Sequence, residues 1–259
     1  MRMLKSALLA GLMVAAAATS FAAEGAGEAA AAPGADWKHW RAGNEIDNTA
    51  SLQRGARNFM NYCVSCHSLK YMRYSRMGED LGISEAVLKE SLILGDAKPA
   101  DYIKAPMPAA DAEAWFGKAP PDLSIITRAR GKDYVFRFLK TFYLDPAKPT
   151  GVNNLALDGT AMPHVLADLE GVKKALYKTG EGEGGAASKV FEGFEVVAPG
   201  KLAPEEFDGF VRDTVNFLVY VGEPAQVKRQ SLGVWVILFL LVFTGLSWLL
   251  YKEYWKDVH

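Results

Sequence analysis

The sequence predicts an all-α domain with inserted loops, followed by one C-terminal transmembrane helix. Three segments repeat apolar residues at helical spacing, and one uncharged apolar stretch near the C-terminus is long enough to cross a bilayer. The chain has 259 residues, of which 50% are hydrophobic and 23% charged, so it can bury a core. Because 29 basic residues stand against 30 acidic ones without a Lys/Arg-rich run, nucleic-acid binding is not expected.

The N-terminus has the pattern of a secretory signal peptide. Arg2 and Lys5 precede an Ala/Leu-rich run, and small residues lead up to a cleavage site after Ala22. An uncleaved anchor is the alternative, but the run is short and Gly/Ala/Pro-rich linker sequence follows it. We therefore expect the chain beyond Ala22 to be exported.

A transmembrane helix is predicted at residues 232–251. These 20 residues contain no Asp, Glu, Lys, Arg or His, and a helix of that length spans roughly 30 Å. Basic residues flank both ends, so the positive-inside rule does not decide the orientation. Export of the preceding domain predicts instead that this helix stops transfer and leaves a short tail in the cytoplasm.

The chain thus divides into five predicted parts: a signal peptide (1–22), a linker (23–35), an exported domain (36–227), the transmembrane helix (232–251) and a cytoplasmic tail (252–259). Acidic residues are in excess only near the end of the exported domain, where residues 165–227 hold 6 basic and 11 acidic side chains. An acidic surface there would steer a basic partner, although a solvated face explains the same composition.

Both cysteines of the chain lie in one motif, Cys63-Val64-Ser65-Cys66-His67, which is the attachment pattern of haem c. Two thiols on one helical turn can form thioethers with the two vinyl groups of a haem, and the adjacent imidazole is then held under the iron. A thioredoxin-like pair would need a βαβ frame, and a zinc site would need two further ligands. The motif predicts one covalently attached haem c with His67 as an axial ligand.

Three helices are expected to enclose this cofactor. The first spans residues 48–63 and delivers the motif at its end, because its apolar positions follow helical spacing. The second spans 134–142, and the third spans 204–222, where a proline opens the helix and a glycine closes it.

Met162 is the expected second axial ligand, since a thioether favours ferrous iron and raises the reduction potential. In small class I cytochromes c, a Pro-Leu loop that lines the haem is followed by a helix and then by the methionine loop. Residues 119–124 (APPDLS) resemble that lining loop. Met162 satisfies this order and Met107 does not, while His164 stays open as an alternative ligand.

Several segments together resemble the cytochrome c1 family, whose members are the haem c subunit of ubiquinol:cytochrome c oxidoreductase. They are 63–74 (CVSCHSLKYMRY), 119–124, 128–136 (RARGKDYVF), Met162-Pro163 and the C-terminal helix, and the resemblance covers about residues 36–257. It implies a class I cytochrome c-like fold in which Pro121 lies in the haem-lining loop and Arg130 and Tyr134 lie near a haem propionate. For Arg130 the alternative is a solvated position before a helix.

The same resemblance implies an electron carrier that takes one electron from a Rieske iron–sulfur protein and passes it to a cytochrome c. Cytochrome b and a dimeric complex are the implied partners. The chain lacks the additional cysteines of mitochondrial relatives, so the implied location is a bacterial inner membrane with the haem domain in the periplasm. With two axial ligands, substrate chemistry is not expected on this chain, which would be the electron-transfer subunit of an oxidoreductase.

Two alternatives to this function stay open. One is an anchored monohaem cytochrome that serves another oxidase or dehydrogenase, and the other is a haem enzyme or gas sensor with an open distal site. The sequence assigns no role to the inserts 68–118 and 166–203. Within the second insert, the Gly/Glu run at 180–185 is expected to be a mobile loop.

Overall fold

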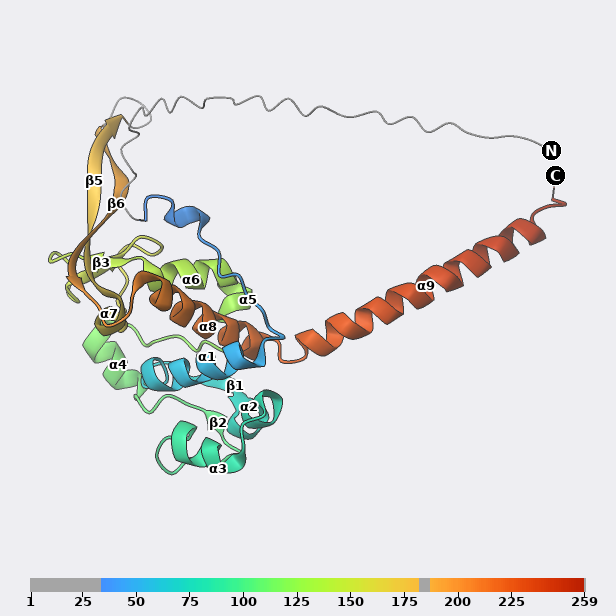
Figure 1. Ribbon diagram of the computed structural model, residues 1–259, viewed down its shortest axis with the longest axis horizontal. Helices are drawn as coiled ribbons and strands as arrows, with labels where there is room; N and C mark the ends of the chain where they lie inside the picture. Colours follow the sequence, from blue (N-terminus) through green and yellow to red (C-terminus); the bar gives the residue numbers. More distant parts are fainter. Residues whose placement is uncertain (1–33, 182–186, 259) are drawn as a thin grey trace, which may run out of the picture. The chain divides into compact units, whose positions relative to one another are not determined.

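The computed structural model describes residues 34–181 and 187–258 (Figure 1). The predicted signal peptide, most of the linker and most of the Gly/Glu run lie outside the described residues. The helices and strands, in chain order, are η1 (Trp37–His39), α1 (Thr49–Tyr62), β1 (Leu69–Arg73), α2 (Tyr74–Leu81), α3 (Glu85–Val87), η2 (Leu88–Leu92), β2 (Tyr102–Ile103), α4 (Ala109–Phe116), α5 (Ile126–Arg130), α6 (Lys132–Lys140), β3 (Phe142–Leu144), β4 (Val152–Asn154), α7 (Ala167–Glu170), β5 (Gly171–Glu181), β6 (Ala187–Pro199), α8 (Pro204–Gly222) and α9 (Gln226–Tyr254).

The structure contains the three predicted helices as α1, α6 and α8. The Asn48 side chain caps α1 by accepting the Ser51 amide at 3.1 Å. Pro204 opens α8, and the Glu206 carboxylate accepts the amide of Ala203 at 2.9 Å. The second helix begins and ends two residues earlier than predicted, because Phe142 already belongs to a strand.

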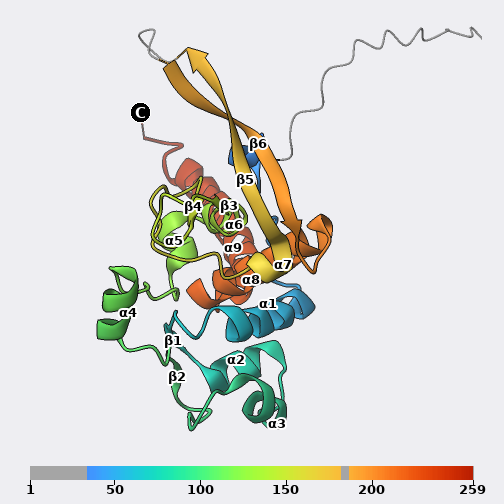
Figure 2. The same ribbon diagram turned by 90° about the vertical axis from the view of Figure 1, so that its left-hand side faces the viewer.

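α1 and α8 lie side by side and form the centre of the core (Figures 1 and 2). They approach so closely at Gly55 that a Cβ atom there would lie 2.1 Å from the Asp213 carbonyl oxygen and 2.6 Å from Phe217 Cβ. Ala56 and Phe59 on one helix and Phe217 on the other are fully buried. Only glycine fits at this crossing.

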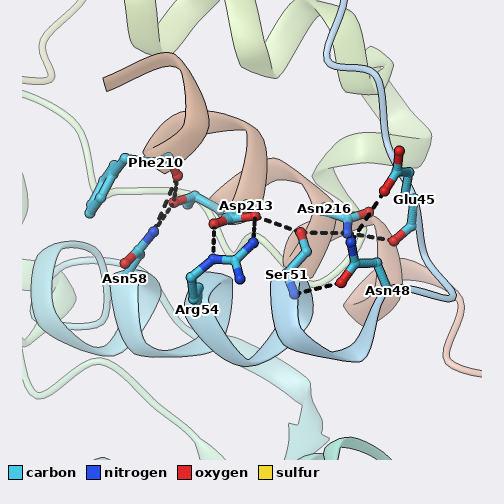
Figure 3. Close-up of polar contacts among 9 residues, drawn as sticks. Glu45, Asn48, Ser51, Arg54, Asn58, Phe210, Asp213 and Asn216 are labelled. Carbon is cyan, nitrogen blue, oxygen red and sulfur yellow. Dashed lines mark hydrogen bonds and ion pairs between the residues drawn. The ribbon is translucent and has the colours of Figure 1, made fainter. Parts of the chain in front are cut away.

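Polar contacts run along the same helix pair (Figure 3). The Arg54 guanidinium binds both carboxylate oxygens of Asp213, at 2.5 and 3.0 Å. Ser51 donates to the same carboxylate at 2.6 Å and accepts from the Asn216 side chain at 2.9 Å. The Asn58 side chain donates to the Phe210 carbonyl at 3.2 Å. These bonds fix the register of the two helices, because sliding one helix along the other would break several of them at once.

The all-α class is too narrow, because the structure also contains three two-stranded antiparallel sheets, β1–β2, β3–β4 and β5–β6. The longest is the ribbon of β5 and β6, which pairs Gly171 with Pro199 and Tyr177 with Phe191. It occupies most of the insert 166–203 and extends away from the helices (Figure 2). Its β-branched and aromatic residues favour strands. The sequence nevertheless predicts an all-α class, because the helical patterns in the other segments are stronger.

The insert 68–118 folds into α2, α3, η2, α4 and the β1–β2 pair. Its buried side chains join the core around α1 and α8, among them Leu69, Met72, Met77 and Ile103. The insert is therefore an extension of the same core.

α9 contains the predicted transmembrane segment and extends beyond it at both ends. Its most apolar 18-residue window has a mean hydropathy of 2.3 and no buried residue. It is long and apolar enough to cross a membrane.

The Gly55 crossing predicts a specific loss of stability. Gly55→Ala is expected to lower the free energy of unfolding by at least about 2 kcal/mol, because overpacking at the crossing exceeds the gain in helix propensity. Gly209→Ala on α8 is the matched control, since no atom lies within 4 Å of its added Cβ. Denaturant unfolding of the full chain in detergent measures both variants. Equal stability of the two would contradict the role of Gly55.

Candidate haem site

The Cys-Cys-His motif forms a tight turn at the end of α1. The Cys63 amide donates to the Phe59 carbonyl at 2.9 Å, and the amides of Cys66 and His67 donate to the Cys63 carbonyl at 3.1 and 2.8 Å. Both cysteines are half-buried free thiols, and burial raises the pKa of the Cys63 thiol to about 12. The backbone therefore holds the two thiols and the imidazole on one turn.

The His67 imidazole is oriented by the carbonyl group of Pro121, which lies 2.7 Å from Nδ1. Because a carbonyl oxygen only accepts hydrogen bonds, Nδ1 carries the proton and the lone pair is on Nε2. Burial lowers the pKa of His67 and outweighs the opposing effects of the Pro121 bond and the Asp122 carboxylate. The ring is therefore neutral at pH 7 and offers Nε2 to a metal, as axial histidines usually do.

The predicted lining loop is fastened to the chain that follows the motif. The Leu123 amide donates to the Ser68 carbonyl at 2.9 Å. The Asp122 carboxylate accepts the amides of Lys70 and Ser124, both at 2.9 Å. These contacts fix the loop, and with it the carbonyl group that orients the imidazole.

α5 connects the far end of this loop to α8. The Thr127 hydroxyl donates to the Leu218 carbonyl at 3.2 Å. A Cβ on Gly222 would lie 3.2 Å from the Thr127 hydroxyl oxygen, so the two segments pack tightly. The lining loop is thus held between the chain that follows the motif and α8.

Asn154 shapes the start of the loop that carries Met162. Its side-chain oxygen accepts the amides of Ala156 and Leu157 at 2.8 and 3.2 Å, and its side-chain amide donates to the Phe138 carbonyl at 2.7 Å. The side chain is almost fully buried. It replaces the backbone partners that this irregular segment lacks.

Asn153 holds the next turn. Its oxygen accepts the Gly159 amide at 2.9 Å, and its side-chain amide donates to Asp158 at 2.7 Å. Thr160 then accepts the Met162 amide on its hydroxyl at 3.3 Å. Met162 itself is half-buried and packs against the core.

His164 follows Met162 by two residues in the chain and contacts Phe142 and Glu170. Its ring is parallel to that of Phe142 at 5.0 Å between centroids, and its Nε2 lies 3.0 Å from a carboxylate oxygen of Glu170. It also lines a cavity of about 240 Å³ with residues of β3, β4 and β5. None of the lining residues belongs to the motif or the lining loop.

Arg130 and Tyr134 are neighbours, as the propionate hypothesis requires. The guanidinium lies 5.8 Å from the centroid of the Tyr134 ring, within range of a cation–π contact. Arg130 is exposed, and the described part of the chain provides it with no ion pair. Its charge is therefore available to an added carboxylate.

The residues present fit a haem c. The donor set is one imidazole nitrogen, one thioether and two free thiols, which is the set that this cofactor uses. Half-buried apolar side chains pack against the same core as Cys63 and Met162; they include Leu123, Ile126, Tyr134, Phe138 and Phe210. A macrocycle would complete their burial.

A domain of this construction, on a chain with one apolar C-terminal helix, places the protein among membrane-anchored c-type cytochromes. The chain belongs to the cytochrome c1 family: the sequence model described as "Cytochrome C1 family" matches residues 37–258. Members of this family bind one covalently attached haem c.

Curated relatives agree with this assignment. Over 215 residues the chain is 50% identical to cytochrome c1 of Allochromatium vinosum, an alignment that covers 83% of this chain and 87% of the relative. It is 44% identical over 209 residues to a Nitrosomonas europaea protein named ammonia monooxygenase gamma subunit, with 81% and 84% covered. It is 29% identical over 247 residues to cytochrome c1 of Rhodospirillum rubrum, with 86% and 87% covered.

The sequence did not reveal Asn153, Asn154 and Glu170 as parts of the site. Two successive asparagines before an Asp-Gly pair indicate a turn, but nothing in the pattern shows that both are buried. The burial depends on β3 and α6, which lie elsewhere in the chain.

Asn154→Ala tests the first of these residues. The substitution is expected to lower the free energy of unfolding by about 2–4 kcal/mol, because it leaves several buried backbone groups unbonded. Asn61→Ala, at an exposed position of α1, is the control and should change stability little. Denaturant titration followed by haem absorption measures both, and equal midpoints would show that Asn154 does not hold the loop.

Proposed function

We propose that this chain is the electron-transfer subunit of a cytochrome bc1 complex, with haem c bound to Cys63 and Cys66 and ligated by His67 and Met162. The observation that carries the proposal is the 2.7 Å contact of His67 Nδ1 with the Pro121 carbonyl, which leaves Nε2 free for iron. Membership of the cytochrome c1 family supports it independently.

Met162 is the better candidate for the second ligand than Met107 or His164. Met162 packs against the same core as Cys63, whereas Met107 lies just before α4, which buries only Ala112. The His164 ring lies between Phe142 and Glu170.

Bound haem c supplies a one-electron couple, and the residues of this chain set the conditions for it. His67 is held in one tautomer by Pro121, so no proton moves from Nδ1 when the charge of the site changes. Arg130, beside the Tyr134 ring, would meet a haem propionate, and its cation would stabilise that carboxylate. With His67 and Met162 both as ligands, the iron would have no open position for a substrate, so the site would transfer electrons only.

The partners and the topology follow from the family and from α9. We infer that electrons come from a Rieske iron–sulfur protein within a complex that also contains cytochrome b, and leave to a cytochrome c. The complex would be dimeric, as the resemblance implies. Residues 36–227 would lie in the periplasm of a bacterium, α9 in the inner membrane and residues 252–259 in the cytoplasm. The apolar character of α9 and the identity to bacterial cytochromes c1 support this arrangement.

One relative favours a second candidate. The Nitrosomonas europaea protein carries the name of a monooxygenase subunit, so a cytochrome of this type could serve another oxidoreductase.

Subunit composition separates the two candidates. Purification of the tagged full chain in mild detergent is expected to recover a cytochrome b and a Rieske protein with quinol:cytochrome c reductase activity. Recovery of a different oxidase or dehydrogenase, without those two subunits, would refute the proposed function.

Met162→Leu tests the ligand. We expect a lower haem potential, carbon monoxide binding to the ferrous protein and loss of turnover, because leucine cannot ligate iron. Met107→Leu is the control and should leave the spectrum intact. Redox titration and difference spectra with carbon monoxide measure both variants, and an unchanged potential in Met162→Leu would exclude this ligand.

A further inference from the structure

The chain that follows Met162 is attached to a buried cluster of charges. Glu170, at the end of α7, and Lys173, on β5, form an ion pair with side chains that are only 12% and 11% exposed. The Lys173 ammonium also donates to the Lys140 carbonyl at 2.7 Å and lies 4.4 Å from the centre of the Phe194 ring. Buried charges are costly unless paired, so this cluster has one strongly preferred arrangement.

Glu170 connects this cluster to the methionine loop through its second carboxylate oxygen. That oxygen lies 3.0 Å from His164 Nε2, and the His164 side chain is 7% exposed. Both atoms are buried and the pair is not aligned as a linear hydrogen bond; because a carboxylate oxygen only accepts, the contact is attractive when Nε2 carries the ring proton. The Phe142 ring stacks on the face of the His164 imidazole and restricts its rotation. The ring is therefore held in position and in orientation.

Only Pro163 separates the held ring from Met162. Adjacent Cα atoms are 3.8 Å apart and proline fixes its own φ, so a fixed His164 leaves Met162 little freedom. Space for movement exists beside the cluster, where a cavity of about 240 Å³ is lined by Pro163, His164 and Lys173. Without its attachment to Glu170, the loop could shift into this space.

We propose that Glu170 is a positioning residue that keeps Met162 on the haem iron by holding His164. This inference rests on the proposed ligation by Met162. Asn153, Asn154 and Thr160 would hold the loop before Met162, and Glu170 holds it after Met162. The ligand would then be fixed from both directions along the chain.

Glu170→Gln tests the proposal, because it retains the shape of the side chain and removes its charge. In the full chain we expect a weaker ferric charge-transfer band of methionine ligation and a lower midpoint potential. The fraction of ferrous protein that binds carbon monoxide should rise about tenfold, the effect of losing one charged buried contact. Haem staining on a denaturing gel should be unchanged, since attachment at Cys63 and Cys66 does not depend on this contact.

Asp168→Asn is the matched control. Asp168 lies on the same short helix and pairs with Lys201 at 2.7 Å, but both side chains are exposed, so the spectrum and carbon monoxide binding should stay those of the parent. If Glu170→Gln behaves like this control, the proposal is overturned. If Met162→Leu also keeps the band, the ligand assignment itself has failed.

A second variant keeps the test decisive if Glu170→Gln yields no holoprotein. His164→Phe retains an aromatic ring against Phe142 and removes only the contact with the carboxylate. A weakened methionine band in this variant supports the proposal, and an unchanged band overturns it.

Discussion

The close approach of α1 and α8 at Gly55 is the constraint on which the rest of the domain depends. One helix ends in the Cys-Cys-His turn, and the other receives the Thr127 hydroxyl of the segment that follows the lining loop. The two parts of the His67–Pro121 contact therefore come from segments that are attached to these two helices, one to each. The bidentate contact of Arg54 with Asp213 fixes that register. A shift of the crossing would displace the imidazole and the carbonyl group that orients it relative to each other.

The sequence was sufficient for features that depend on local pattern. The apolar spacing of residues 48–63, the proline at 204 and the cysteine spacing are encoded within a few residues, and the structure contains the corresponding elements. The bond from His67 joins residues 54 positions apart, and its acceptor is a backbone atom that any residue type would provide. Strand pairing of β5 with β6 is similarly hidden, because a short apolar run fits a helix or a strand equally well. These features depend on tertiary contacts, which a single sequence does not show.

The acidic excess of residues 165–227 has a structural explanation. Three of these carboxylates pair with basic residues outside the segment: Asp208 with Lys140, Asp213 with Arg54, and Glu223 with Arg128 and Arg229. Two others pair within it, Asp168 with Lys201 and Glu170 with Lys173. Much of the excess thus balances charges within the domain. Of the other glutamates in the second insert, Glu181 and Glu183 have no described side chain, and Glu192 lies 3.6 Å from Lys178. A net charge counted along a chain is therefore poor evidence for a docking surface.

The crossing at Gly55 also has a consequence for the order of events during biogenesis. Contacts between α1 and α8 join residues 152 to 165 positions apart, so a chain exported N-terminus first, as proposed, would have the cysteine motif outside well before α8 follows. Loops of this length close late, since the partner must first be available. Until α8 packs on α1, the core beside the two thiols would stay open to an incoming haem. The long stretch of sequence between the two helices would thus leave time for haem to attach before α1 and α8 pack together.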